Sequence, residues 1–233
     1  KNNGTINITG GSYHKYISNS SSNLNINDAT INTSDNGLSN DYSGVVTIKN
    51  STITSNSTGI SNGEGIINLI NSTVSSKYYS INNHSTGTIN VTGATNITST
   101  ENHGIYNDSK GTITIGEKDG NVSTKTPIIT GKTYGIYNSD NSIFNFYDGV
   151  ITGETGATYG KVNEVEPGYK INITDNEDGT KSATLTPIGD EARVAVINKI
   201  NFGDLQSAIN YAPDNATSNI TIYANITLDS NIV

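Results

Sequence analysis

A short segment of alternating apolar and polar residues recurs along the first two thirds of the chain. It has the form of Thr5–Ile8 and returns at intervals of 18, 22, 21, 22, 24 and 31 residues. The first apolar residues of the copies are Ile6, Leu24, Val46, Ile67, Ile89, Ile113 and Phe144. Self-similarity with a period of about 22 residues is typical of architectures in which each repeat stacks on its neighbours.

Two further elements recur in phase with the first. One ends in asparagine in every copy, as in Gly59–Asn62 and Gly104–Asn107, and the other has the form of Thr30–Asn32. A complete unit therefore contains three short strands, which are too short to bury an apolar face alone. Because stacking in register buries these faces, the sequence predicts an all-β fold: a right-handed parallel β-helix (β-solenoid) of about seven coils spaced about 4.8 Å apart.

The composition agrees with a β-helix better than with a disordered chain. Only 32% of the residues are hydrophobic and 15% are charged, against about 45–50% and about 25% in ordinary globular domains. Uncharged polar residues scattered without a period would indicate a disordered segment. In a β-helix, each short strand directs an aliphatic residue inward and leaves polar residues on flat outer walls, so a low apolar fraction still permits a continuous core.

The asparagines that end the second element form a regular series. They are Asn19, Asn40, Asn62, Asn83, Asn107 and Asn138. Asparagine tolerates left-handed backbone geometry, and its side-chain amide can hydrogen-bond to the asparagine of the next coil. We interpret the series as a structural ladder at a turn of each coil.

The pattern changes towards the C-terminus. The segment 116–121 is predicted to loop out of one coil, and the β-helix is predicted to span residues 1–153. Residues 154–190 are predicted to form a connector whose hairpin, around an Asp-Gly turn at residues 175–179, covers the open edge of the last coil. Residues 191–233 are predicted to contain a capping helix, with Asn201 or Asp204 as its N-cap, and the first strands of a second β-helix-like unit, among them residues 219–223 and 225–228.

The sequence resembles the pectate-lyase-like β-helix modules of large cell-surface adhesins from low-GC Gram-positive bacteria. The coil pattern covers about two thirds of the chain, and the helix over residues 201–209 is similar to the helix that caps the N-terminal end of such modules. The resemblance implies an extracellular, cell-surface location, with wall anchoring through regions outside this chain. Because the helix lies near the C-terminus here, we expect a monomeric piece of a longer protein.

Residues that could catalyse a reaction are sparse. The chain has no cysteine, which excludes disulfides, cysteine-based zinc sites and a thiol nucleophile. A lyase needs clustered carboxylates for calcium and a basic residue, yet Arg193 is the only arginine and lies outside the coils. His103 resembles the histidine-glycine element of polygalacturonases, but their paired aspartates are missing, so we interpret it as a solvated turn residue. The sequence predicts neither a catalytic site nor a metal or cofactor.

The charge and the hydropathy pattern restrict the partners. A formal net charge of −8 disfavours nucleic acid. No apolar run approaches the about 20 residues of a membrane span, so we expect no direct membrane insertion.

Tyrosine is the predominant aromatic residue of this chain, with 13 Tyr against three Phe and no Trp. Aromatic rings beside amides and carboxylates can bind sugars. The candidate ligand-binding patch is Tyr106, Asn107, Asp108, Tyr134 and Tyr137. Tyrosines that merely shield the wall are the alternative, and Thr-x-Thr repetition on another wall is too irregular for an ice-binding face.

These features favour a non-catalytic extracellular adhesin segment that binds a host or environmental glycan or surface protein through its lateral walls. A structural stalk and a polysaccharide lyase or hydrolase with an unrecognised site are the alternatives.

Overall fold

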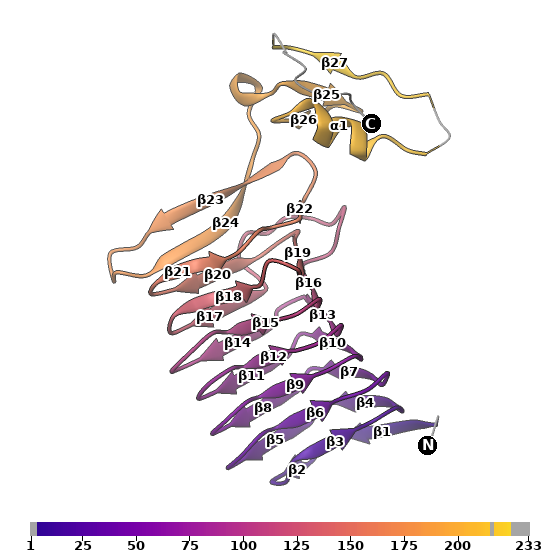
Figure 1. The fold of residues 1–233 in the computed structure, drawn as a ribbon, viewed down its shortest axis with the longest axis vertical. Helices are drawn as coiled ribbons and strands as arrows, with labels where there is room; N and C mark the ends of the chain where they lie inside the picture. The colour runs from indigo at the N-terminus through magenta and orange to yellow at the C-terminus, as the bar shows by residue number, and fades with distance from the viewer. Residues whose placement is uncertain (1–3, 215–216, 225–233) are drawn as a thin grey trace.

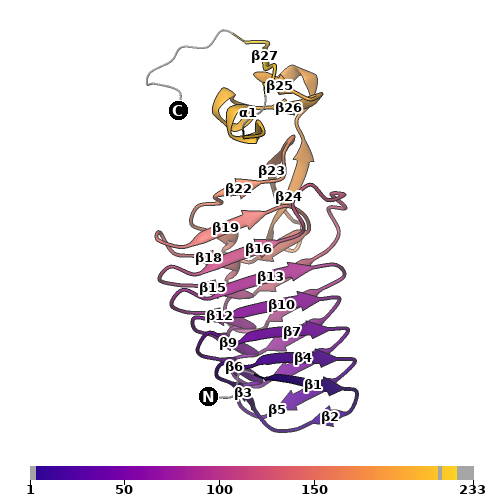
Figure 2. The ribbon, with the colours of Figure 1, turned by 90° about the vertical axis from the view of Figure 1, so that its right-hand side faces the viewer.

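The computed structural model describes residues 4–214 and 217–224 and contains a parallel β-helix with three walls. Figures 1 and 2 show the coils stacked along the long axis, with a hairpin and a small C-terminal unit at one end. About seven stacked coils are present in the described part of the chain, which confirms the predicted all-β solenoid. The register aligns Ile6 with Leu24 and Val46, as the sequence period predicts.

Each wall is a sheet built from one strand of every coil. Wall A faces the viewer in Figure 2 and comprises β1 (Thr5–Thr9), β4 (Asn23–Asn27), β7 (Val45–Lys49), β10 (Ile66–Ile70), β13 (Thr88–Thr92), β16 (Thr112–Ile115), β19 (Ile143–Phe146) and β22 (Glu164–Val165). Wall B comprises β2 (Ser12–Tyr13), β5 (Thr30–Thr33), β8 (Thr52–Ser55), β11 (Thr73–Ser76), β14 (Asn96–Ser99), β17 (Ile128–Gly131) and β20 (Val150–Gly153). Wall C comprises β3 (Ile17–Asn19), β6 (Leu38–Asn40), β9 (Ile60–Asn62), β12 (Ile81–Asn83), β15 (Ile105–Asn107), β18 (Tyr134–Asn138) and β21 (Gly156–Tyr159).

The core is a stack of aliphatic side chains in line with one another. The strands of wall A from β4 to β19 bury two apolar residues each, such as Ile67 and Leu69 of β10, and walls B and C contribute Val74 and Ile81 at the same level. Phe144 and Phe146 continue the stack in β19. Burying one such side chain stabilises a fold by about 1.5–3 kcal/mol, so the repeated aliphatic positions account for stability despite the polar composition.

The six ladder asparagines lie inside the coil and not at left-handed turns. They end the strands of wall C, and the side-chain amide of each donates to the side-chain oxygen of the next, as from Asn83 to Asn107 at 2.7 Å. The left-handed positions are elsewhere, at Asp28, Asn50 and Asn71, where φ is 53°, 49° and 50°. The predicted amide contacts are therefore present, whereas the predicted backbone reason for asparagine is wrong.

Parallel pairing continues beyond the predicted boundary at residue 153. β21 still pairs with β18, and β22 with β19. These last strands escaped detection because β21 buries only Gly156 and Ala157, and β22 has two residues. The β-helix therefore extends to Val165.

The hairpin of β23 (Tyr169–Asp175) and β24 (Lys181–Pro187) closes the stack. β24 pairs antiparallel with β20, so the hairpin extends wall B, as predicted. The predicted loop between β16 and β17 is also present, and it reaches the same end of the rod, where Lys118 forms an ion pair with Glu164 of β22.

The C-terminal unit follows a 3₁₀ turn, η1 (Asp190–Ala192), and has a small core of its own. Its strands β25 (Ala195–Ile197), β26 (Ile200–Phe202) and β27 (Thr221–Ile222) pair antiparallel, so the described residues contain no parallel coil of a second β-helix. The turn at Asn198 and Lys199 explains this pairing, because two consecutive positive φ angles, 51° and 68°, form a tight hairpin.

The helix of this unit is α1 (Leu205–Tyr211), and Asp204 is its N-cap, accepting a hydrogen bond from the Ser207 backbone N–H at 2.8 Å. The predicted strand over residues 225–228 lies outside the described residues. Within the described part of the chain, no helix has the length and apolar character needed to cross a membrane.

Candidate functional site

Aromatic rings gather on the outer face of wall C, over the half nearest the hairpin. We call this cluster the aromatic patch, and it comprises Tyr79, His103, Tyr106, Tyr134, Tyr137 and Tyr159. Two vertical columns make up the patch, because the coil repeat returns each ring to the same place on the wall. The structure thus brings three of the predicted residues, Tyr106, Tyr134 and Tyr137, into one group.

The first column follows the register position of Tyr106, the middle residue of β15. In this position Tyr106 aligns with Tyr137, and Tyr137 aligns with Tyr159. The ring centroids of Tyr106 and Tyr137 are 5.2 Å apart, and those of Tyr137 and Tyr159 are 4.4 Å apart with an interplanar angle of 8°. Burial and the neighbouring Tyr159 raise the pKa of Tyr137 above its ordinary value. The column is a ladder of three phenol rings in contact, of which Tyr137 and Tyr159 are stacked.

The second column contains Tyr79 and His103, which lie just before β12 and β15, and Tyr134, the first residue of β18. The His103 ring packs against Tyr106 and Tyr137 with centroids 5.7 and 5.0 Å apart, and its Nδ1 is 2.6 Å from the Thr133 hydroxyl. Desolvation by burial lowers the pKa of His103 from 6.5 to about 4. The interpretation of His103 as a solvated turn residue is therefore wrong: it lies before the strand but joins the two columns as a neutral ring.

Two predicted patch residues have other surroundings. Asn107 is fully buried and its amide donates to Asn138 and to the Gly111 carbonyl, so it belongs to the asparagine ladder and does not reach the outer surface. Asp108 follows Asn107 in the turn, where its carboxylate accepts a hydrogen bond from the Ser109 backbone N–H at 2.6 Å.

Asp108 still influences the patch. Burial first, then the charge of Asp108 and the neighbouring Tyr79, raise the pKa of Tyr106. Asp108 therefore acts on the patch as a neighbouring charge at its edge.

Sequence reasoning missed Tyr79, His103 and Tyr159. The signal was present, because Tyr159 follows Tyr137 by one repeat length and His103 occupies the place of Tyr134 relative to the next glycine. Tyr159 was overlooked since the predicted β-helix ended at residue 153.

No family model, curated protein or solved structure matches this chain. Among residues 4–214 and 217–224, no group of three or more histidine or acidic side chains is placed to hold a metal ion.

Proposed function

We propose that this chain is a non-catalytic segment of an extracellular bacterial adhesin, and that it binds a neutral glycan through the aromatic patch. The segment projects from the cell surface as a rod, within a longer, wall-anchored protein. The observation that carries the proposal is that six aromatic rings pack against one another on one half of wall C.

This clustering matters because the β-helix does not require an aromatic residue at the strand position of Tyr106. The same position of wall C holds Ser18, Ser39 and Ser61 in the first coils, and only Asn82 separates Ser61 from Tyr106. These coils keep the same register with a serine, and not an aromatic residue, at this position. Rings needed only to shield the wall would extend along its whole length, so their local concentration supports a binding role.

The stacking geometry supports Tyr159 as the ring on which a sugar would stack. The faces of Tyr106 and Tyr137 are covered by neighbouring rings, so these residues would present their edges and hydroxyl groups to the ligand. Tyr159 is different, because among the described residues no strand follows β21 in wall C, and 44% of Tyr159 is exposed. A sugar ring on Tyr159 would continue the column, with a face-on contact of the kind that aromatic side chains make with apolar ring faces.

The electrostatics favour an uncharged ligand. His103 is neutral near pH 7 because its pKa is about 4, and the raised pKa values of Tyr106 and Tyr137 keep these phenols neutral. The patch therefore offers hydroxyl groups and ring surfaces without a counter-charge for an acidic polysaccharide. A neutral glycan matches these groups through hydrogen bonds and stacking.

A glycan array that also carries matrix proteins tests the proposal. Wild-type protein should bind one class of neutral glycan, and Tyr159→Ala should weaken the binding about tenfold through the loss of stacking and buried area. Tyr42→Ala is the matched control, since Tyr42 is 62% exposed and lies outside the patch.

Failure has two distinct forms. If the wild-type protein binds neither glycan nor matrix protein, and Tyr106→Ala and Tyr137→Ala change nothing, the chain is a stalk. Release of unsaturated or reducing sugar from pectin would identify it as an enzyme.

A further inference from the structure

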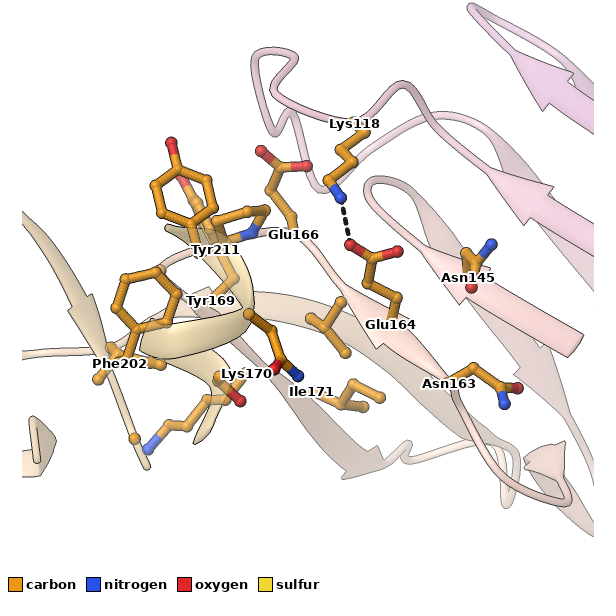
Figure 3. A pocket seen from close by; sticks show the side chains of 17 residues that line it. Lys118, Asn145, Asn163, Glu164, Glu166, Tyr169, Lys170, Ile171, Phe202 and Tyr211 are labelled. Atoms are coloured by element: carbon orange, nitrogen blue, oxygen red, sulfur yellow. Dashed lines mark hydrogen bonds and ion pairs between the residues drawn. The ribbon is translucent and has the colours of Figure 1, made fainter. Parts of the chain in front are cut away.

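A cleft of about 730 Å³ lies where the end of the β-helix meets the C-terminal unit. Figure 3 shows its two sides: Asn145, Asn163 and Glu164 come from wall A and the segment before β22, whereas Phe202 and Tyr211 come from β26 and α1. The volume falls in the range of about 300–1,000 Å³ that small-molecule sites occupy, and sites are common where two units meet. This cleft is separate from the aromatic patch.

Glu166 is the most unusual side chain of the cleft. Only 6% of the residue is exposed, and its Oε2 accepts a hydrogen bond from the Asp119 backbone N–H at 3.1 Å. The carboxyl group also lines the cleft. Because water reaches so little of this residue, a ligand hydroxyl in the cleft that hydrogen-bonds to the carboxyl group would meet weak competition from solvent.

The neighbouring Glu164 is ionised, and its charge is already paired. Lys118 forms an ion pair with it, and the Tyr147 hydroxyl donates to its Oε2 at 2.7 Å. Burial opposes ionisation of Glu164, but the hydrogen bonds from Lys118 and Tyr147 outweigh it and lower the pKa of this carboxyl. Lys170 and Glu166 are the other charged side chains of the lining, one of each sign, so the four charged groups include two lysines and two glutamates and favour neither an anion nor a cation.

The rest of the lining suits a sugar. Phe202 and Tyr211 form an aromatic pair with centroids 5.5 Å apart, and Tyr169 also lines the cleft. The amide groups of Asn145 and Asn210 offer both donors and acceptors. Aromatic rings, amides and the nearly buried carboxyl group of Glu166 together match a hydroxyl-rich ring with an apolar face.

We propose that this cleft binds a single neutral sugar unit, with Glu166 as the hydrogen-bonding anchor and Phe202 and Tyr211 as the apolar side. The site is a pocket for one ring at the end of the rod, whereas the aromatic patch is an open lateral surface. A bound sugar would contact both units and hold the C-terminal unit against the β-helix.

Saturation-transfer NMR and calorimetry with three probes test the proposal: methyl β-D-glucopyranoside, methyl α-D-galactopyranoside and N-acetyl-D-glucosamine. At least one probe should bind wild-type protein with a millimolar dissociation constant, the range expected for a ligand of this size. At pH 8, above the pKa of about 7 of Glu166, Glu166→Gln should weaken binding about tenfold, because a charge-assisted hydrogen bond is lost. Asn210→Ala should weaken it about threefold and is safe for folding, since Asn210 is exposed on α1.

The control is Tyr159→Ala, which alters the aromatic patch and should leave binding of the probe unchanged. Absence of saturation transfer from all three probes at about 20 mM would overturn the proposal. So would binding that Glu166→Gln and Asn210→Ala both leave intact, or binding that only Tyr159→Ala abolishes. Melting temperatures of the variants, measured alongside, separate a loss of binding from a loss of folding.

Discussion

The asparagine ladder makes a quantitative prediction for Asn83→Ala. Asn83 is fully buried and takes part in three side-chain hydrogen bonds. Its amide donates to the Gly87 carbonyl at 2.8 Å and to the Asn107 oxygen at 2.7 Å, and its oxygen accepts from the Asn62 amide at 2.9 Å. Alanine removes all three bonds and leaves polar atoms of Gly87, Asn107 and Asn62 without these partners inside the rod.

The expected cost follows from these contacts. Each hydrogen bond contributes about 1 kcal/mol net, and each buried group left unsatisfied raises the cost, so Asn83→Ala should lower the free energy of unfolding by about 3–5 kcal/mol. With a urea dependence of about 2 kcal/mol per molar, the unfolding midpoint should fall by about 2 M.

Equilibrium urea unfolding, followed by circular dichroism, measures this loss. Asn90→Ala is the matched control from the next strand, β13, because the Asn90 amide donates to Asn68 at 2.9 Å on the partly exposed face of wall A. It should cost about 0.5 kcal/mol. A loss below about 1 kcal/mol for Asn83→Ala, or one equal to that of Asn90→Ala, would refute the role assigned to the ladder.

Three further predictions concern packing and pH. Gly87→Ala should lower the melting temperature, because a methyl group there overlaps the side chains of Asn62 and Asn83, whereas at Gly203 it meets only an Ile188 methyl at 3.9 Å. Burial raises the pKa of Glu166 from 4.5 to about 7, so its stabilisation is complete below about pH 4.5 and is lost as the pH rises through 7. Burial lowers the pKa of His103 from 6.5 to about 4, so its stabilisation is present above about pH 6.5 and is lost as the pH falls through 4.

Melting temperatures between pH 4 and 8 check the two titrations. Relative to Glu166→Gln, the wild-type protein should lose stability from pH 4.5 to 8, and relative to His103→Phe it should lose stability from pH 6.5 to 4. If the melting temperatures of wild type and variant change with pH in the same way, the burial of Glu166 or of His103 is contradicted. Equal melting temperatures of Gly87→Ala and Gly203→Ala would contradict the close approach of Gly87 to the side chains of Asn62 and Asn83.

The coil register was predictable because it follows from strong, repeated signals. Period-two alternation assigns Ile67 and Ile89 to the core, and an asparagine at the end of the second element sets the phase of each coil. A slip of one residue would turn the aliphatic side chains outward, so only one register buries them. The hairpin was predictable for a similar reason, since Gly179, with a φ of 85°, marks its turn.

Other features depend on contacts that a one-dimensional pattern does not contain. The Asn198-Lys199 turn lacks the glycine that usually marks a tight hairpin, so β26 was not predicted. The burial of His103 depends on rings from neighbouring coils, and the surroundings of Glu166 depend on the loop that carries Asp119, 47 residues earlier. Local composition describes a residue's neighbours in the chain, whereas these sites are built from neighbours in space.

The most direct test of the glycan-binding claim is an NMR titration of protein labelled with ¹³C in its tyrosine rings, using the glycan that the array identifies. The ring signals of Tyr137 and Tyr159 should shift together and saturate at one dissociation constant, while those of Tyr42 and Tyr78, exposed outside the patch, stay in place. Shifts at Tyr42 or Tyr78 without shifts at Tyr137 and Tyr159 would show that the aromatic patch is not the binding surface.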